Sequence, residues 1–423
     1  MGFFRRIFKK DNIKGDYLLA LDIGTEFVKA LVFKVNRDKK IGEIVGIGCE
    51  KQRINNMQAG AVADINGVVE ISKKAIGLAK AMAKTDPSQV IVGIAGEFVR
   101  GSAATFVCAR KEPNQKIDLT ELKNVIQKFQ WQAYNKIRQD LAEETGISEI
   151  EIKLINATII DIRIDGYRVT NPLGFQGKEL MLSIFNAYSP LMHLGALQSI
   201  VDALNLKLLF VAAEPYAIAK ATKLSDDFLK ENAIFIDIGG GTTDLALVRQ
   251  GGIEGIKSLA LGGRAFTKRL SQVLGVDFDE AEQIKLKYSN KDVSGSVKQK
   301  ITSAFKKDVS VWLSGVQIAL EEFSQLNPLP AHIFLCGGGS LLPNIKRALE
   351  DQAWTISLPF PQPPEISFIQ SKNIKNIIDK TEQLNEPKDI TPLSLASLAI
   401  ELTQDEDVVL ATILKRALRL IQT

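Results

Sequence analysis

Blocks of apolar residues along the chain indicate strands that are separated by helices. Residues 17–23 and 28–35 are two apolar runs of strand length, joined by a short polar turn. Apolar positions in residues 66–84 recur at helical spacing, and beyond Asp86 and Pro87 the run 90–95 is again typical of a strand. The order strand, strand, helix, strand predicts an α/β layer.

The middle of the chain has a different pattern. Residues 111–177 contain a polar stretch, a charged helix predicted at about 119–145, and alternating strands within 150–169. The α/β pattern then returns and is followed by a long helical region, residues 278–326, and by a packed helix predicted within 391–402. We therefore expect a smaller domain inserted into a larger α/β protein.

One strand–turn–strand unit occurs twice. The sequence DIGTEF occupies residues 22–27, and DIGGGTTD occupies residues 237–244, each between two apolar runs. A third glycine-rich turn, GGGS, occupies residues 337–340 after the apolar run 333–336. A duplicated unit predicts two similar domains that face each other.

These turns carry the residue types that bind phosphate and a divalent cation. Glycine allows a turn to direct its backbone N–H groups at a phosphate from close range. Asp22 and Asp237 occupy equivalent places in the two units, and carboxylates beside phosphate are favourable when a cation such as Mg²⁺ lies between them. Lys29, on the strand after the first turn, can reach the phosphates as a point charge. One such turn alone is also typical of an ordinary hairpin, whereas three together favour a nucleotide site.

The motifs DIGT with a following lysine, EPYAIA, DIGGGTTD, GGR, AEQIK and GGGS occur in that order within residues 18–350. As a set they resemble the ATPase fold shared by actin, Hsp70 and sugar kinases. The resemblance implies an α/β protein with a two-lobed actin-like ATPase fold, an inserted α+β subdomain in the first lobe, and ATP with Mg²⁺ in the cleft between the lobes. Glu282 and Lys285 would face the ribose and adenine. The nucleotide-binding residues that it implies are Gly24, Thr25, Glu26, Lys29, Gly239, Gly240, Gly241, Thr242, Thr243, Gly263, Glu282, Lys285, Gly337, Gly338 and Gly339.

Glu214, in the motif AAEPYAIA, is the candidate catalytic residue. It matches the position at which actin-like filament proteins carry a polar residue that orients the attacking water. A carboxylate near the γ-phosphate can position water or accept its proton. The alternative is structural, because a glutamate before Pro215 also suits the first turn of a helix.

Within this superfamily, residues 58–83, 90–101 and 164–180 resemble the segments that enter and leave the inserted subdomain of FtsA, the bacterial cell-division actin homologue. The type IV pilus protein PilM shares that insert. The resemblance implies the following division of the chain: residues 16–90 and 173–218 form the first lobe, 91–172 the insert, and 219–400 the second lobe, in which 258–328 close over the nucleotide.

Both ends of the chain have basic amphipathic patterns. In residues 1–15 the apolar side chains among the first ten fall on one helical face and the basic ones on the other. In residues 404–423 the apolar face contains Val409, Ile413 and Leu420, and Lys415 is among the basic residues opposite. Such helices lie in the interface of an anionic membrane, and FtsA carries its membrane-targeting helix at the C-terminus. The alternative for each is a helix packed on the protein's own core.

Composition mainly disfavours other functions. The chain has 53 Lys and Arg against 49 Asp and Glu, and the charges are mixed along the sequence, so nucleic acid is not an expected partner. The three cysteines lack zinc or disulfide spacing, and we expect all of them to be buried apolar residues. No apolar run approaches the roughly 20 residues of a transmembrane helix, which favours a cytoplasmic protein.

The function that the resemblance to FtsA implies is that of a nucleotide-gated, self-associating filament protein of cell division. It would hydrolyse ATP slowly and tether the tubulin-like polymer FtsZ to the inner face of the cell membrane. A PilM-like scaffold of type IV pilus assembly is the alternative. A small-metabolite kinase of the same fold is a third candidate, but the sequence lacks the signature of a catalytic aspartate in the first lobe.

Overall fold

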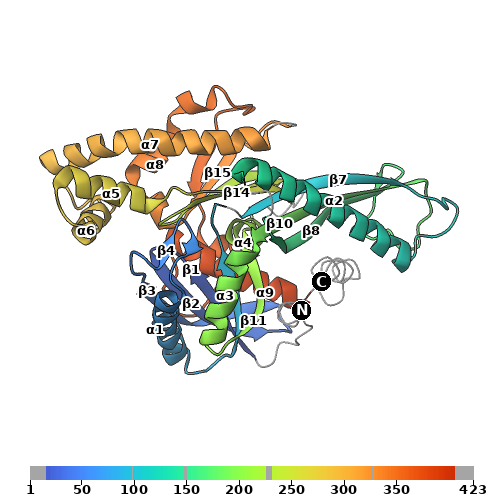
Figure 1. The fold of residues 1–423 in the computed structure, drawn as a ribbon, viewed down its shortest axis with the longest axis horizontal. Coiled ribbons are helices and arrows are strands. Elements are labelled where there is room, and N and C mark those ends of the chain that lie inside the picture. The colour runs from blue at the N-terminus through green and yellow to red at the C-terminus, as the bar shows by residue number, and fades with distance from the viewer. Residues whose placement is uncertain (1–15, 98, 147–149, 225–230, 325–326, 405–423) are drawn as a thin grey trace.

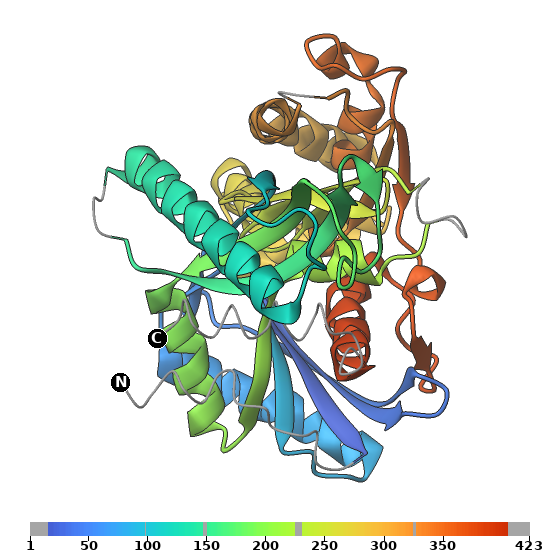
Figure 2. The same ribbon diagram turned by 90° about the vertical axis from the view of Figure 1, so that its right-hand side faces the viewer.

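The computed structural model describes residues 16–97, 99–146, 150–224, 231–324 and 327–404 (Figure 1). The two amphipathic ends predicted from the sequence, residues 1–15 and 405–423, lie outside the described residues. Two large sheets organise the described part of the chain, and the views in Figures 1 and 2 show them as separate lobes.

The first lobe is built on a six-stranded sheet. Its strands are, in spatial order, β11 (Lys207–Ala213), β6 (Gln89–Ile94), β1 (Tyr17–Ile23), β2 (Phe27–Asn36), β3 (Ile41–Lys51) and β17 (Ile377–Asp379). The central strands β1 and β6 are buried along nearly their whole length. This explains their continuous apolar sequences, because strands covered on both faces do not alternate with polar residues. Strands β4 (Met57–Gln58) and β5 (Ala61–Val62) form a separate two-stranded ribbon between β3 and α1 in the chain.

The second lobe is built on a nine-stranded sheet. Its strands are, in spatial order, β16 (Glu365–Phe368), β15 (His332–Cys336), β12 (Ala233–Ile238), β13 (Thr243–Arg249), β14 (Gly252–Leu259), β7 (Arg100–Ala109), β10 (Glu179–Pro190), β8 (Ile152–Ile164) and β9 (Tyr167–Arg168). Strands β12 and β13 pair antiparallel and β15 runs parallel to β12, as β1, β2 and β6 do in the first sheet. The duplicated sequence unit therefore corresponds to a duplicated structural unit.

Helices cover both sheets. They are α1 (Ile65–Ala83), α2 (Leu119–Thr145), α3 (Leu191–Ala203), α4 (Glu214–Ala221), α5 (Gly263–Leu274), α6 (Phe278–Ser289), α7 (Gly295–Phe323), α8 (Pro343–Glu350) and α9 (Ile390–Gln404), with the 3₁₀ turns η3 (Gly338–Leu341), η4 (Gln352–Thr355), η5 (Ser371–Asn373) and η6 (Pro387–Asp389). Helix α2 is capped at its N-terminus by Asp118, whose side chain accepts a hydrogen bond from the Glu121 N–H. Gly146, in the left-handed conformation, caps its C-terminus. Within the described residues, no helix combines the length and the apolar character needed to span a bilayer.

The insert leaves the first lobe after β6, and the chain returns to that lobe at α3, whose residues Leu197 and Ile200 belong to its core. In space its strands extend the second sheet, because β7 pairs with β14 at Ser102–Gly255 and Gly101–Ile256. Helix α2 lies across β7, β8 and β10 and closes a separate apolar cluster around Phe129 (Figure 1). The insert thus has a small core of its own.

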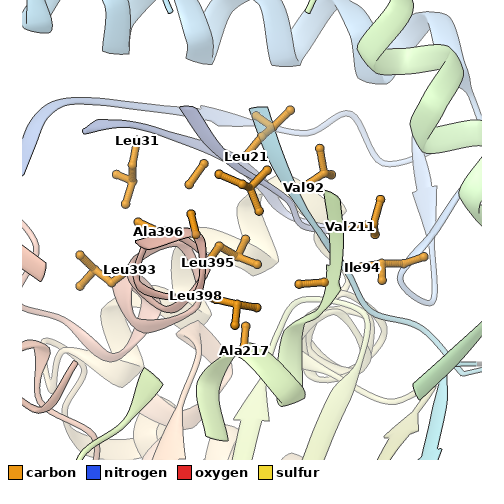
Figure 3. Close-up of a cluster of buried hydrophobic side chains, with 14 of the residues drawn as sticks. Leu21, Leu31, Val92, Ile94, Val211, Ala217, Leu393, Leu395, Ala396 and Leu398 are labelled. Atoms are coloured by element: carbon orange, nitrogen blue, oxygen red, sulfur yellow. The ribbon is translucent and has the colours of Figure 1, made fainter. Parts of the chain in front are cut away.

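Helix α9 completes the core of the first lobe. In Figure 3, Ala396 and Leu395 lie on the side of the sheet residues Leu21 and Leu31, and Leu398 lies on the side of Ala217 in α4. Burying one leucine side chain of this kind contributes at most about 1.5–3 kcal/mol. Helix α9 therefore packs between the sheet and α4, which holds both in place.

Several sequence predictions differ from the structure. Residues 219–400 were assigned to the second lobe, but β17 pairs with β3 and α9 packs on the first sheet. Residues 173–218 were assigned to the first lobe, but β10 pairs with β7 and β8. Strand pairing is decided by contacts between distant segments, which sequence order does not show. Of the cysteines, only Cys336 is buried, while Cys108 is half-buried and Cys49 is exposed.

Candidate nucleotide and metal site

The two predicted phosphate turns lie against each other. The Gly24 N–H donates to the Phe27 carbonyl at 3.0 Å, and the Gly239 N–H donates to the Thr242 carbonyl at 2.9 Å, so each turn closes its own hairpin. A Cβ added to Gly241 would lie 2.6 Å from Thr25 Oγ1, a separation that atoms do not tolerate. Glycine is therefore required for the close approach of the two turns.

Four buried carboxyl groups gather behind the turns. Asp22, Asp237, Glu214 and Asp244 are each 8% exposed or less. Burial raises the pKa of Asp237 to about 6, the Thr391 hydroxyl that donates to its Oδ2 at 2.7 Å opposes the rise, and Asp22 adds to it. Burial also raises the pKa of Asp22, against the opposing effect of the Lys29 ammonium.

The cluster has little positive charge to balance it. Within the part of the chain that the structure describes, Lys29 Nζ forms an ion pair with Asp22 Oδ2 at 3.7 Å. Lys29 also donates a hydrogen bond to the Lys388 carbonyl. Buried carboxylates that repel one another are stabilised by protons or by a bound cation. Asp22 and Asp237 therefore fit a divalent cation.

Within the described ranges, no group of three or more His, Cys, Asp or Glu side chains is arranged to hold a metal ion without other ligands. Magnesium keeps several waters and is commonly held by one or two carboxylates together with substrate phosphates. A site that contains only Asp22 and Asp237 from the protein matches that requirement.

Glu214 is the first residue of α4 and its carboxyl group belongs to the buried cluster. Burial, followed by Asp22, Asp244 and Asp237, raises the pKa of Glu214 well above its usual value. A Cβ added to Gly93 of β6 would lie 2.7 Å from Glu214 Oε1, so the side chain passes directly over the sheet. Glu214 therefore both begins the helix and contributes its carboxyl group to the buried cluster.

The insert supports the segment that carries Glu214. Asn156 Oδ1, on β8, accepts a hydrogen bond from the Ala213 N–H at 2.9 Å, immediately before the helix begins. One turn further on, the Tyr216 hydroxyl is 2.7 Å from Thr158 Oγ1. The insert thus contacts the first turn of α4, the helix that begins with Glu214.

Asp244 is a member of the cluster that the sequence analysis did not select, although it ends the motif DIGGGTTD. Thr242 Oγ1 donates to its Oδ2 at 2.9 Å, and Ser258 donates to its other oxygen. Burial raises the pKa of Asp244 to about 7, Asp237 adds to the rise, and the two hydroxyls oppose it. Its neighbours hold it as a structural carboxyl group behind the second turn.

This raised pKa predicts a pH-dependent stability. The pKa of an aspartate in the unfolded chain is 3.8, and that of Asp244 in the folded protein is about 7. Between these two pH values the folded protein holds a proton on Asp244 that the unfolded chain has released. The contribution of this group to the unfolding free energy therefore falls as pH rises through that window. Asp244→Asn removes the titration, so we expect its melting temperature to rise relative to wild type by about 5 °C between pH 4 and 8 without nucleotide. The exposed variant Asp292→Asn should show no such trend, and a constant difference for Asp244→Asn would contradict the assignment.

The residues expected near the ribose and base form a second cluster. Lys285 Nζ lies 2.7 Å from Glu282 Oε2, donates to the Gly263 carbonyl at 3.1 Å and is 2.8 Å from Thr267 Oγ1. The Gly263 N–H donates to the Gly239 carbonyl at 2.9 Å. The structure therefore brings Gly263, Glu282 and Lys285 together and joins them to the second turn.

The third glycine-rich turn lies beside Asp237. Gly337 has a φ of +80°, which favours glycine, and its N–H donates to the Pro387 carbonyl at 2.9 Å. A Cβ at this position would collide with Asp237 Oδ1. Gly339 approaches the Ile238 carbonyl in the same way, while Gly338 faces Lys388. The three predicted turns thus meet around one group of residues, whose roles in binding stay predictions.

The duplicated hairpins and the meeting of the turns define a protein of the actin-like ATPase fold. A solved structure titled "PilM-PilN type IV pilus biogenesis complex" has a TM-score of 0.64 and 17% identity, and the match covers 90% of this chain and 98% of that chain. At this identity the likeness shows the fold alone. The two-lobed fold predicted from the sequence is confirmed.

Sequence comparison finds similarity to FtsA proteins. The family model "Cell division protein FtsA" matches residues 234–390. The proteins of that name from Neisseria meningitidis and Bacillus subtilis are 30% and 24% identical over 273 and 354 residues, which is 64% and 79% of this chain. The matches cover 61% and 76% of those two relatives. Over the matched part, the chain is therefore similar to FtsA proteins, which agrees with the resemblance given by the sequence motifs.

Proposed function

We propose that this protein is a magnesium- and ATP-binding, actin-like filament protein that acts in bacterial cell division. The observation that carries the proposal is the match of the FtsA family model to residues 234–390, which include the second and third glycine-rich turns. The buried carboxyl cluster supports it, because Asp22 and Asp237 come from equivalent strands in the two lobes. A nucleotide held there would contact both lobes at once.

In this proposal the protein positions ATP and stabilises its charge. The backbone N–H groups of the two turns and the Lys29 ammonium bind the phosphates. Asp22 and Asp237 hold Mg²⁺, which neutralises phosphate charge when bound. Glu214 orients a water molecule for attack and accepts its proton, and the slow hydrolysis that results releases the filament contacts.

We further propose that the protein attaches the FtsZ polymer to the inner face of the cytoplasmic membrane. The basis is the amphipathic sequence of residues 404–423, together with the similarity to FtsA proteins. Self-association into filaments multiplies weak membrane contacts, because linked sites bind with a high effective concentration. The basic residues 1–15 provide a second contact with anionic lipid.

The similarity to FtsA proteins favours this function over pilus assembly. The likeness to PilM extends to the fold, whereas the family model and the named relatives are FtsA proteins. A metabolite kinase is disfavoured by the same comparison. Division is therefore the function that the observations support best.

The helix predicted from the sequence of residues 404–423 gives a direct test. Ile413 lies on the predicted apolar face and Thr412 on the polar face, so the same substitution by glutamate separates the two contributions. Burial of an isoleucine contributes about 1.5–3 kcal/mol, so Ile413→Glu is expected to lower the affinity for phosphatidylglycerol-containing vesicles roughly 10- to 100-fold. Co-sedimentation with Mg-ATP, inspected for filaments by electron microscopy and repeated with FtsZ, measures this.

Thr412→Glu is the matched control, because it changes charge equally and leaves the apolar face intact. It should weaken binding by less than Ile413→Glu, and added salt should weaken both. If the two variants sediment alike, the apolar face does not enter the membrane. If vesicles recruit neither filaments nor FtsZ through the wild-type protein, the division proposal fails.

A further inference from the structure

The side chain of Arg264, in the second lobe, donates four hydrogen bonds to the first lobe. The Arg264 guanidinium donates to the Thr25 carbonyl at 2.6 Å and to Glu26 Oε2 at 2.7 Å. It also donates to the carbonyls of Ile54 at 3.0 Å and Met57 at 3.2 Å. Two of these acceptors, Thr25 and Glu26, belong to the first phosphate turn.

The backbone of the same residue is bonded to the other phosphate turn. The Arg264 N–H donates to the Gly240 carbonyl at 2.8 Å, and the preceding Gly263 N–H donates to the Gly239 carbonyl at 2.9 Å. The first N–H groups of a helix have no partner within the helix. Here the second turn supplies those partners to α5, so Arg264 is bonded to both phosphate turns.

The burial of this contact makes it stronger than the other ion pair between the lobes among the described residues. The side chains of Arg264 and Glu26 are 16% and 12% exposed. Lys51 and Asp279 also join the two lobes, at 2.7 Å, but they are 40% and 72% exposed. Exposed ion pairs contribute little because water screens them, whereas buried charge-assisted hydrogen bonds are strong.

We propose that Arg264 is a positioning residue that holds the two phosphate turns together and thereby limits the rate at which nucleotide leaves. The inference rests on the proposed nucleotide binding. A nucleotide whose phosphates lie between the turns is released when the turns separate, and separation breaks the bonds of Arg264 to Thr25 and Glu26. The Glu26 carboxylate accepts a hydrogen bond from Arg264, and its predicted role in nucleotide binding stays a prediction.

Release of a fluorescent ADP analogue in magnesium buffer tests the proposal by stopped flow. We expect Arg264→Gln to release it about tenfold faster than wild type, because bonds to a charged group are lost. Arg264→Lys, which keeps the charge but not the planar fork, should release it at an intermediate rate. Lys51→Gln is the matched control in the exposed interlobe pair and should release it at nearly the wild-type rate.

A double-variant cycle shows whether Arg264 acts through Glu26. Glu26→Gln alone should accelerate release, and Glu26→Gln with Arg264→Gln should release no faster than Arg264→Gln, because the partner is already lost. Additive accelerations would overturn the coupling. An unchanged release rate in Arg264→Gln, with wild-type melting temperature, would overturn the proposal itself.

X-ray scattering without nucleotide separates this proposal from the proposed function. If the wild-type protein does not bind the ADP analogue, the proposed nucleotide binding is wrong. The radius of gyration without nucleotide then still tests whether Arg264 holds the two turns together. Arg264→Gln should then have a larger radius of gyration than wild type and Lys51→Gln an unchanged one. If Arg264→Gln has the wild-type radius in that case, the proposal is also wrong. Should Arg264→Gln not fold, Glu26→Gln serves in its place.

Discussion

Asp237→Asn is expected to weaken ATP binding roughly 10- to 100-fold in magnesium buffer, in the range found for changes around bound metals, and to have little effect in EDTA. The substitution removes one of the two carboxylates that the duplicated hairpins place in equivalent positions. Without Mg²⁺, a carboxylate beside phosphate is repulsive, so its loss is then neutral or favourable. Asp22→Asn should act in the same way. Isothermal titration with a non-hydrolysable ATP analogue, with and without Mg²⁺, measures the difference.

The comparison needs a control for the change in net charge. Asp279→Asn makes the same change on α6, where the side chain is 72% exposed, and it should leave both affinities close to wild type. Equal losses in magnesium and in EDTA for Asp237→Asn would remove the metal role. They would indicate instead that Asp237 supports the turn through its bond from Thr391.

Local signals in the sequence were sufficient for many elements. The strand predicted at 17–23 and the helix predicted at 119–145 coincide with β1 and α2, because continuous apolar residues and helical spacing act within a few residues. Helix α9 was predicted as a packed helix but assigned to the wrong lobe. Its residues 390–400 are buried all round, so this part of the sequence has no exposed polar face to indicate what the helix packs against.

In the candidate site, too, residues within motifs could be predicted from the sequence, whereas residues that reach the site from distant segments could not. Asp22, Asp237 and Glu214 were selected from motifs, and the structure brings them together. Arg264 and Thr391 were not selected, although they contact the first turn and Asp237. Each acts across more than 150 positions of the chain, and a single sequence does not pair such residues. Arg264 ends the motif GGR and Thr391 lies in an apolar helix, so the residues next to each in the sequence indicate only a structural role.

Glu214→Gln is expected to lower ATP turnover roughly 100-fold while it changes ATP affinity little. Glutamine has the size of glutamate and can begin α4, but it does not accept the proton of the attacking water. Steady-state phosphate release and nucleotide titration measure the two quantities. Tyr216→Phe is the matched control on the same helix, because it removes the contact with Thr158 and keeps the carboxyl group. It should retain most of the turnover.

The pH dependence distinguishes a proton acceptor from a structural carboxyl group. Burial and the neighbouring carboxylates raise the pKa of Glu214 well above its usual value, and the group accepts a proton only when ionised. The value of kcat/KM reports ionisations of the free protein, so in the wild type it should increase as pH rises through this raised pKa. In Glu214→Gln that increase should be absent, and Tyr216→Phe should retain it. If Glu214→Gln shows wild-type turnover and the same pH profile, the residue only starts the helix, and hydrolysis depends on the turns, Lys29 and the metal without a carboxylate base.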